Sequence, residues 1–271
     1  MVFELDVKLI EKKFSPLFIS TNSTWRFIPP IATSGVRQMA IDRYLLEQHR
    51  AGKQSSVIRF YTWQPAAISL GYHQKEYFNR SSNLVWQEKP LDIVRRPTGG
   101  RAVLHQGDLT YTIVTSIPPG KRLEVYQQIC QFLIVGWRSL GVELDYGTAT
   151  KEYIQHQNCF ATATGSDLVT PQGNKVIGSA QLRRGKTVLQ HGSMIIDTDR
   201  ELYRQVFGTT LQQNLLQAIS PVKDRSTRYQ QSDLTAKIIN SLTQAAIAIF
   251  KIDLVEQPFS TTEWQDIANM E

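Results

Sequence analysis

The chain has 271 residues, which is enough for one large domain with a proper core or for two small ones. Its 30 lysines and arginines exceed its 24 aspartates and glutamates by a formal charge of +6, without the basic stripes and interleaved aromatic residues of nucleic-acid-binding proteins. No segment approaches the roughly 18 uninterrupted apolar residues of a membrane helix, and the N-terminus lacks the compact apolar segment of a signal peptide. We therefore expect a cytoplasmic protein that binds neither nucleic acid nor membrane.

We interpret residues 1–24 as an added arm or edge strand before the domain proper. The first predicted helix spans residues 36–50, where apolar residues follow helical spacing. Two short runs that are rich in β-forming residues follow at 57–63 and 67–70, and Pro65 separates them.

The middle of the chain continues with strands and one long helix. Strands are predicted at 92–94 and 109–115, on either side of a glycine loop. The clearest helix spans residues 124–140, because apolar residues recur at three and four positions, and Gly141 is well placed to cap it. Cys130 lies within this helix, and we expect it to be packing or half-exposed filler.

The last elements are a predicted hairpin and a helix. Strands are expected at 175–181 and 187–197, with the turn at residues 183–186, and a helix at 233–250. Strands dominate the middle of the chain and helices punctuate it. The pattern predicts an α/β (α+β) fold with a mixed, largely antiparallel sheet flanked by helices.

Residues 95–105 form a glycine loop with arginines on both sides. The pair Gly99-Gly100 lets the backbone turn and approach a ligand closely, since no Cβ intervenes. Amides and guanidinium groups in such a loop can bind anionic or carbonyl oxygens. A hairpin turn with solvated arginines is the alternative. The loop is neither a Walker A loop nor a Rossmann fingerprint.

Two further segments are candidates for a binding site. The predicted strand that begins at Lys175 has only small side chains at residues 178–180, which are Gly-Ser-Ala. Such a stretch indicates either that a ligand approaches the backbone closely or that the strand has a β-bulge. His191 and Gly192 lie in an apolar strand that could line a pocket, although a histidine in this setting is more often structural.

The two cysteines, Cys130 and Cys159, cannot build a disulfide scaffold or a Cys-x-x-Cys metal site, so we expect free thiols and no bound metal. Cys159 lies in an irregular stretch, where catalytic groups are often found. A cation near this thiol would lower its pKa from about 8.5 and populate the thiolate. Lys175 could supply that charge; an incidental, inert thiol is the alternative.

Taken together and in this order, these segments resemble the lipoate–protein ligase A family. The matching motifs are Trp25–Ile28, Met39–Asp42, Arg59–Ala66, Ser69–Tyr72, Arg95–His105, Lys175–Gln181 and His191–Ser193. The resemblance implies a catalytic domain at residues 25–253 with the fold of lipoate and biotin protein ligases. Residues 1–24 would then be an arm and residues 254–271 a tail.

Within that family the chain is most similar to the octanoyltransferase branch. Cys159 is followed sixteen positions later by Lys175, as are that branch's acyl-accepting cysteine and its pKa-lowering lysine. Arg101 follows the glycine pair, where ligases tend to carry a third glycine, and the chain ends soon after the main domain. The loop at residues 161–167 departs from the family, because it lacks the expected proline and aromatic residues.

The resemblance implies that Cys159 is the nucleophile and that Lys175 activates it. The donor would be octanoyl-acyl carrier protein, and the acceptor a lysine of the glycine cleavage H protein or of a 2-oxo acid dehydrogenase lipoyl domain. No cofactor is expected, because a thioester donor needs no ATP. The substrate-binding residues would be Arg95, Arg96, Gly99, Gly100, Arg101, Ala102, Val103, His105, Gly178, Ser179, Ala180, Gln181, His191 and Gly192.

Two other functions fit the same segments. The first is an ATP-dependent lipoate–protein ligase, in which ATP and Mg would form lipoyl-AMP, Lys175 would bind the adenylate and Cys159 would be passive. The second is a non-catalytic module that binds acyl carriers and keeps the pocket for packing.

Overall fold

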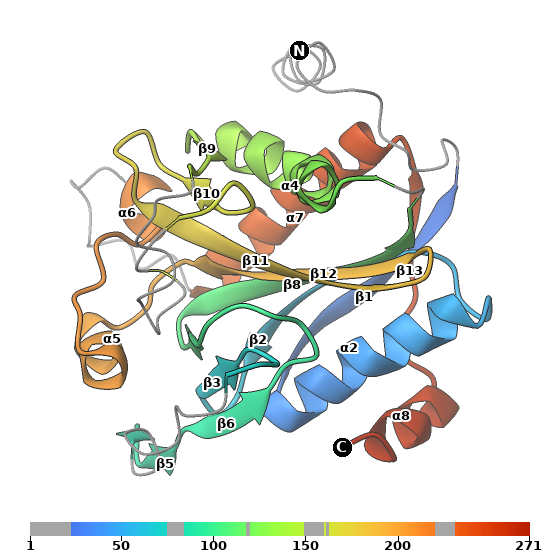
Figure 1. Cartoon of the computed structure of the whole chain (residues 1–271), viewed down its shortest axis with the longest axis horizontal. Helices are drawn as coiled ribbons and strands as arrows, with labels where there is room; N and C mark the ends of the chain where they lie inside the picture. The colour runs from blue at the N-terminus through green and yellow to red at the C-terminus, as the bar shows by residue number, and fades with distance from the viewer. Residues whose placement is uncertain (1–22, 75–83, 118–119, 149–159, 161–162, 220–230) are drawn as a thin grey trace.

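A computed structural model of the chain describes residues 23–74, 84–117, 120–148, 160, 163–219 and 231–271. Its centre is an eight-stranded mixed sheet (Figure 1). In spatial order the strands are β13 (Asp253–Glu256), β1 (Thr24–Thr33), β2 (Val57–Trp63), β8 (Asp108–Ser116), β12 (Thr187–Ile195), β11 (Lys175–Arg184), β10 (Leu168–Val169) and β9 (Asp145–Tyr146). Within this sheet only β13, β1 and β2 are paired in parallel, so the predicted fold class is confirmed.

A second, three-stranded sheet has the order β6 (Asp92–Arg95), β3 (Ala67–Leu70), β7 (Val103–His105). Strands β6 and β7 do not pair with each other, because each pairs with β3. The hairpin alternative for residues 95–105 is therefore wrong, and the glycine loop crosses over β3 instead. The two-residue strands β4 (Val85–Trp86) and β5 (Lys89–Pro90) form a separate small hairpin.

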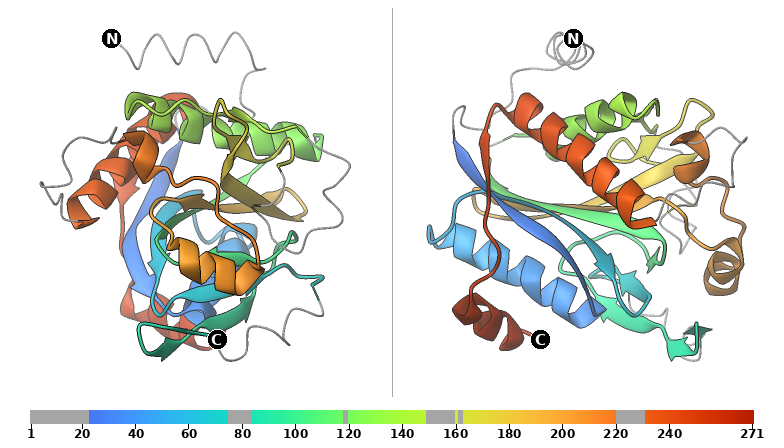
Figure 2. Two further views of the ribbon diagram at one scale, coloured as in Figure 1. Left: turned by 90° about the vertical axis from the view of Figure 1, so that its left-hand side faces the viewer. Right: turned by 180° about the vertical axis from the view of Figure 1, so that it is seen from behind.

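Helices cover both faces of the large sheet. On one face lie α4 (Arg122–Ser139) and α7 (Gln231–Phe250), and on the other lie the small sheet, α2 (Gly35–Arg50) and α8 (Thr261–Ala268) (Figures 1 and 2). The short helices α5 (Arg200–Phe207) and α6 (Leu216–Ile219) follow β12. The largest hydrophobic cluster lies between the sheet and the α4–α7 layer. It includes Cys130, which is fully buried, so of the two predicted roles the packing one is confirmed and the half-exposed one is wrong.

The long predicted helices are confirmed, and their ends follow local chemistry. Helix α4 ends in a Schellman motif: the amide of Gly141 donates to the carbonyl of Arg138 and the amide of Val142 to that of Trp137. The prediction that residues 183–186 form the β11–β12 turn is wrong at its first half. Arg183 and Arg184 still pair with β12, and only two residues connect the strands.

The end of the chain is an integral part of the fold. Residues 254–271, which the family resemblance implies to be a tail, supply most of β13 and all of α8. Arg26 on β1 anchors them: its guanidinium donates to both carboxylate oxygens of Glu263, at 2.6 and 3.1 Å, and to the carbonyls of Gln257 and Pro258. Of the predicted arm, residues 1–22 lie outside the described residues.

Breaking this anchor should destabilise the protein strongly. The Arg26 side chain is 4% exposed, so Arg26→Met removes the ion-pair partner of Glu263 and the donor to the Gln257 and Pro258 carbonyls, and should lower the free energy of unfolding by about 3 kcal/mol. Arg50→Met, which removes the exposed Arg50–Glu47 pair, is the matched control and should cost less than about 1 kcal/mol. Equilibrium urea unfolding measures both, and equal losses would contradict the anchor.

Candidate active site

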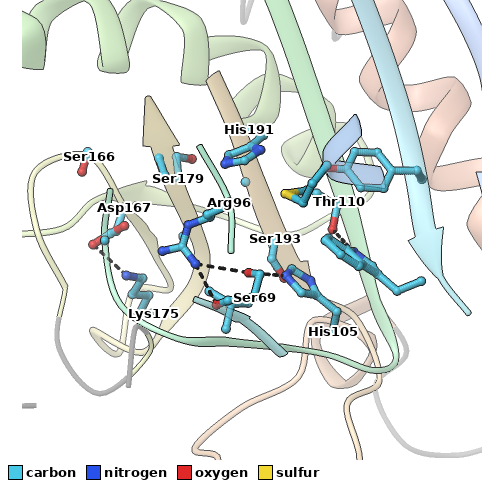
Figure 3. Close-up of a pocket in the computed structure, with 18 of the residues that line it drawn as sticks. Ser69, Arg96, His105, Thr110, Ser166, Asp167, Lys175, Ser179, His191 and Ser193 are labelled. Carbon is cyan, nitrogen blue, oxygen red and sulfur yellow. Dashed lines mark hydrogen bonds and ion pairs between the residues drawn. The ribbon is translucent and has the colours of Figure 1, made fainter. Parts of the chain in front are cut away.

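A cavity lies on the face of the large sheet that the small sheet covers, and its volume is about 540 Å³ when the open solvent at its mouth is included (Figure 3). Its lining comes from both sheets, from α2 and from the loops before β7 and β10. The residues are Met39, Tyr61, Trp63, Ser69, Arg96, Gly100, Val103, His105, Thr110, Thr164, Ser166, Asp167, Lys175, Gly178, Ser179, Ala180, His191, Gly192 and Ser193.

The floor of the cavity runs across the strands rather than along them. Gly178 on β11 is paired with Ser193 on β12, Ser193 with Thr110 on β8, and Thr110 with Tyr61 on β2. These four lining residues therefore form one row over four neighbouring strands, and their side chains grow from none to a phenol. The row makes a trough whose floor rises from a bare glycine at β11 to the aromatic ring of Tyr61 at β2.

At position 192 only a glycine fits, because neighbouring atoms lie too close for a side chain. A Cβ at Gly192 would lie 2.6 Å from the Tyr111 ring and 2.8 Å from the carbonyl oxygen of Gly178. Because these neighbours include backbone, they cannot move aside cheaply. The small residues that the sequence marks in β11 and β12 thus let the two strands and the tyrosine pack while leaving room above them.

The charged end of the cavity holds a buried ion pair. Lys175 Nζ lies 2.9 Å from Asp167 Oδ2, and both side chains are at most 3% exposed. The amide and the hydroxyl of Thr164 each donate to the same carboxylate oxygen at 2.8 Å. The Lys175 ammonium also lies 5.3 Å from the centre of the Phe160 ring. These contacts fix the position of the ammonium group at the wall of the cavity.

Arg96 organises the glycine loop from within. Its side chain is buried, and Nη1 donates to the carbonyl and the hydroxyl oxygen of Ser69 at 2.9 and 3.2 Å. Nε and Nη2 donate to the carbonyl of Gly99, and Nη2 also to that of Arg101 at 2.7 Å. For Arg96 the solvated-arginine alternative is therefore wrong, because this guanidinium holds the loop's backbone against β3.

His105 is the centre of a hydrogen-bonded chain in the cavity wall. Its Nδ1 lies 2.8 Å from Asp108 Oδ2, and its Nε2 lies 2.8 Å from the hydroxyl of Ser69. Since a carboxylate only accepts, Nδ1 donates to Asp108. The imidazole also stacks on Trp63, with ring centres 3.8 Å apart. These contacts fix the orientation of Ser69, His105 and Trp63, which line the cavity.

His191 is held in a similar way on the neighbouring strand. Its Nδ1 donates to Asp42 Oδ2 at 2.8 Å, and its Nε2 accepts from the hydroxyl of Thr98 at 2.6 Å. Burial lowers the pKa of His191 and outweighs the opposing effect of Asp42, so this imidazole is neutral near pH 7. The Thr98 bond ties the glycine loop to β12.

Cys130 lies behind the floor, on the opposite face of the sheet. Its thiol contacts the hydroxyls of Tyr111 and Ser179 at 3.7 Å and the side-chain amide of Gln190 at 3.3 Å. Burial raises its pKa to about 11, although these hydrogen bonds oppose the shift. The thiol is therefore protonated at neutral pH and unsuited to nucleophilic attack.

The structure brings ten of the sixteen residues expected in the site together around one cavity, including Lys175. Gln181 points away from it and hydrogen-bonds Gln190, while Arg95 is exposed and donates to the carbonyls of Gly71, Tyr72 and Gln74. The expected residues that do not line it are Arg95, Gly99, Arg101, Ala102 and Gln181. Cys159 lies outside the described residues.

Nine lining residues were not expected from the sequence, and they are Met39, Tyr61, Trp63, Ser69, Thr110, Thr164, Ser166, Asp167 and Ser193. Ser193 does follow the His191-Gly192 pair in the sequence, and that adjacency was a usable signal. Asp167 had none, because its ion pair forms only when its loop folds back on β11. Among the described residues, no group of three or more His, Cys, Asp or Glu side chains could hold a metal ion. Across the same residues, every helix is too short or too polar to cross a membrane.

Comparison with known proteins places the chain in a family. The model of the lipoyl protein ligase A/B catalytic domain matches residues 34–245. The chain therefore belongs to this family, as its motifs indicated.

Two similar proteins carry the same name, octanoyltransferase LipM. The octanoyltransferase LipM of Carboxydothermus hydrogenoformans is 41% identical over 199 residues, which are 70% of this chain and 72% of that protein. The octanoyltransferase LipM of Bacillus subtilis (strain 168) is 37% identical over 196 residues, covering 68% and 69%.

Solved structures share the fold at low sequence identity. A lipoate-protein ligase A bound with ATP has a TM-score of 0.67 at 18% identity, covering 93% of this chain and 94% of that one. A bi-partite lipoate protein ligase from Thermoplasma acidophilum has a TM-score of 0.61 at 18% identity, covering 93% and 92%.

The neutral, buried state of His191 predicts a pH dependence of stability. Between its lowered folded pKa and the ordinary value of 6.5, the unfolded chain binds a proton that the folded chain does not, so stability should fall as the pH drops below 6.5. His191→Gln should flatten this slope in urea unfolding at pH 7.5, 6.5 and 5.5. His73→Gln, which removes an exposed imidazole, should keep the wild-type slope. A wild-type slope in His191→Gln would contradict the assignment.

Proposed function

We propose that this chain is an octanoyltransferase of protein lipoylation, which moves an octanoyl group from octanoyl-acyl carrier protein to a lysine of a lipoyl carrier domain. The acyl group would pass through a thioester on Cys159. The observation that carries the proposal is the Lys175 ammonium, which is buried at the wall of the cavity. The same ammonium group lies over the ring of Phe160, the residue that directly follows Cys159 in the chain. The names of the relatives support the same chemistry.

The first step is thioester exchange. The Cys159 thiolate attacks the carbonyl carbon of the donor thioester, a new C–S bond forms, and the donor leaves as a thiolate. The positive charge of Lys175 favours the thiolate over the thiol. Asp167 fixes the direction of the ammonium, so that its charge is held at one end of the cavity.

The second step is aminolysis. The acceptor lysine attacks the Cys159 thioester, the amide C–N bond forms, and the C–S bond breaks. The attacking amine loses one proton, which the leaving thiolate or solvent takes up. The acceptor is a lysine of the glycine cleavage H protein or of a 2-oxo acid dehydrogenase lipoyl domain. Neither step consumes ATP, because the donor is already an activated thioester.

The decisive experiment uses the chain's two cysteines as a matched pair. Octanoyl-acyl carrier protein is mixed with the enzyme without ATP, and the intact mass of the enzyme is recorded. We expect a hydroxylamine-sensitive octanoyl adduct that Cys159→Ala abolishes. Cys130→Ala should keep the adduct, because the Cys130 thiol is sealed in the core and protonated.

The same experiment also distinguishes the two alternative functions, an ATP-dependent ligase and a non-catalytic binding module. If no adduct forms, but carrier protein is modified and AMP is released with free lipoate and ATP, the enzyme is a ligase. If neither reaction occurs, the chain is a binding module. An adduct that survives in Cys159→Ala would remove this cysteine from the mechanism.

Lys175→Met should slow enzyme acylation by about 100-fold or more in a single turnover, because the thiolate loses its cation. Lys186→Met, which alters an exposed lysine in the turn at the far end of the same hairpin, is the matched control and should be unaffected. Circular dichroism checks that both variants fold. An unchanged rate in folded Lys175→Met would exclude the lysine from the chemistry.

A further inference from the structure

The end of the cavity opposite the Lys175–Asp167 pair is apolar. Met39, Tyr61 and Trp63 line it and pack together in one small hydrophobic cluster. Figure 3 shows the two ends well apart: the labelled Lys175 and Asp167 lie on one side of the pocket and Thr110 on the other. A site with one charged and one apolar end binds a fatty acyl group in a single direction, with its carbonyl beside the charge.

The span between the two ends follows from strand geometry. The floor row crosses from β11 to β2, which is three strand spacings or about 14 Å. The methyl end of an acyl chain whose carbonyl lies at the charged end therefore points along this row toward the apolar cluster.

Two of the three residues at the apolar end are fixed by polar contacts, and the Tyr61 hydroxyl donates to Asp42 Oδ2 at 3.4 Å. The Trp63 indole donates to the hydroxyl of Thr110 at 2.9 Å and stacks on His105. The Tyr61 ring lies under the Arg59 guanidinium, 3.8 Å from its carbon. Neither ring can move without breaking these contacts, so both are rigid walls.

Met39 is different, because it touches the cavity only through an unbranched thioether side chain. It is 2% exposed and belongs to the first turns of α2. The start of that helix is firmly held: Gln38 donates to the carbonyls of Ile31 and Thr62, and the amide of Gly35 donates to Asp92. The backbone at residue 39 is thus fixed, so a change in the volume of its side chain changes the space at the apolar end of the cavity.

We propose that Met39 sets the longest acyl chain that the enzyme accepts. The inference rests on the proposed function, since it takes the carbonyl to react at the Lys175 end. Shortening this side chain lengthens the cavity by about the space of two or three methylene groups. Enlarging the side chain shortens the cavity by pushing a ring into it.

The test compares hexanoyl, octanoyl and decanoyl thioesters of N-acetylcysteamine in single-turnover acylation of the enzyme. Met39→Ala should raise the decanoyl-to-octanoyl ratio of rate constants at least tenfold, because one misfitting methylene in an apolar pocket already discriminates by about that factor. Met39→Phe should raise the hexanoyl-to-octanoyl ratio by a similar factor. Met39→Leu, close in volume, should leave both ratios within about threefold of the wild type.

Met194→Ala is the matched control. Met194 is equally buried but packs in the large cluster on the opposite face of the sheet, so its loss loosens the core without touching the cavity. It should leave both ratios unchanged. If Met39→Ala fails to fold, the phenylalanine and leucine variants carry the test.

The outcomes separate the two proposals. A wild-type enzyme that takes up no acyl chain of any length overturns the proposed function, and the chain-length inference with it. If the wild type is acylated but the Met39 variants keep its decanoyl-to-octanoyl and hexanoyl-to-octanoyl ratios, the chain-length inference is overturned and the proposed function stands. A shift in Met194→Ala as large as that in Met39→Ala also overturns it, because the cause would then be a loosened core.

Discussion

The buried carboxylate of Asp42 is the constraint on which the cavity depends. It lies on α2, is fully buried, and accepts hydrogen bonds from Arg59, Thr112 and His191. Burial alone would raise its pKa, but the Arg59 and His191 contacts lower it to about 2, so it remains ionised. One charge thereby joins α2 to strands β2, β8 and β12, which carry most of the cavity floor.

Such a charge is tolerated only because its hydrogen bonds are satisfied. An ionised carboxylate without partners costs several kcal/mol in a protein interior, so the native arrangement is favoured over alternatives that would separate Asp42 from Arg59. The same requirement fixes the distance between α2 and the sheet. Met39 lies one turn before Asp42 on the helix, so the position of the apolar end of the cavity is a consequence of this ion pair.

The elements that could be predicted from the sequence are those that depend on interactions between residues close together in the chain. The helix at residues 124–140 and its glycine cap follow from apolar periodicity and backbone freedom, and both are present with nearly the predicted ends. The small residues at 178–180 line the cavity because a strand without bulk leaves space. Helix α8 could also have been found, because Ser260 and Glu263 form a capping box that is readable in the sequence.

The remaining site residues were hidden because their roles arise from distant contacts. Met39 and Trp63 are ordinary apolar residues in the sequence, and they become cavity walls only when α2 packs beside β2 and β3. Ser69 gains its role when the glycine loop crosses β3 and brings Arg96 and His105 to its hydroxyl. No periodic pattern encodes such contacts, so a family resemblance could identify the motifs without giving the shape of the cavity.

The two ends of the cavity offer different environments to an acyl group: one end holds a buried charge and the other is apolar. A buried ammonium is most effective where water is excluded, since its field is poorly screened there. An apolar chain is bound most strongly where no polar group must be desolvated without a partner, and the aromatic end meets this condition because the indole of Trp63 is already hydrogen-bonded. The floor row connects the two environments across four strands, so a ligand that fills the trough aligns its reactive end with the charge. Binding energy from the chain is thereby converted into orientation at the reacting carbonyl.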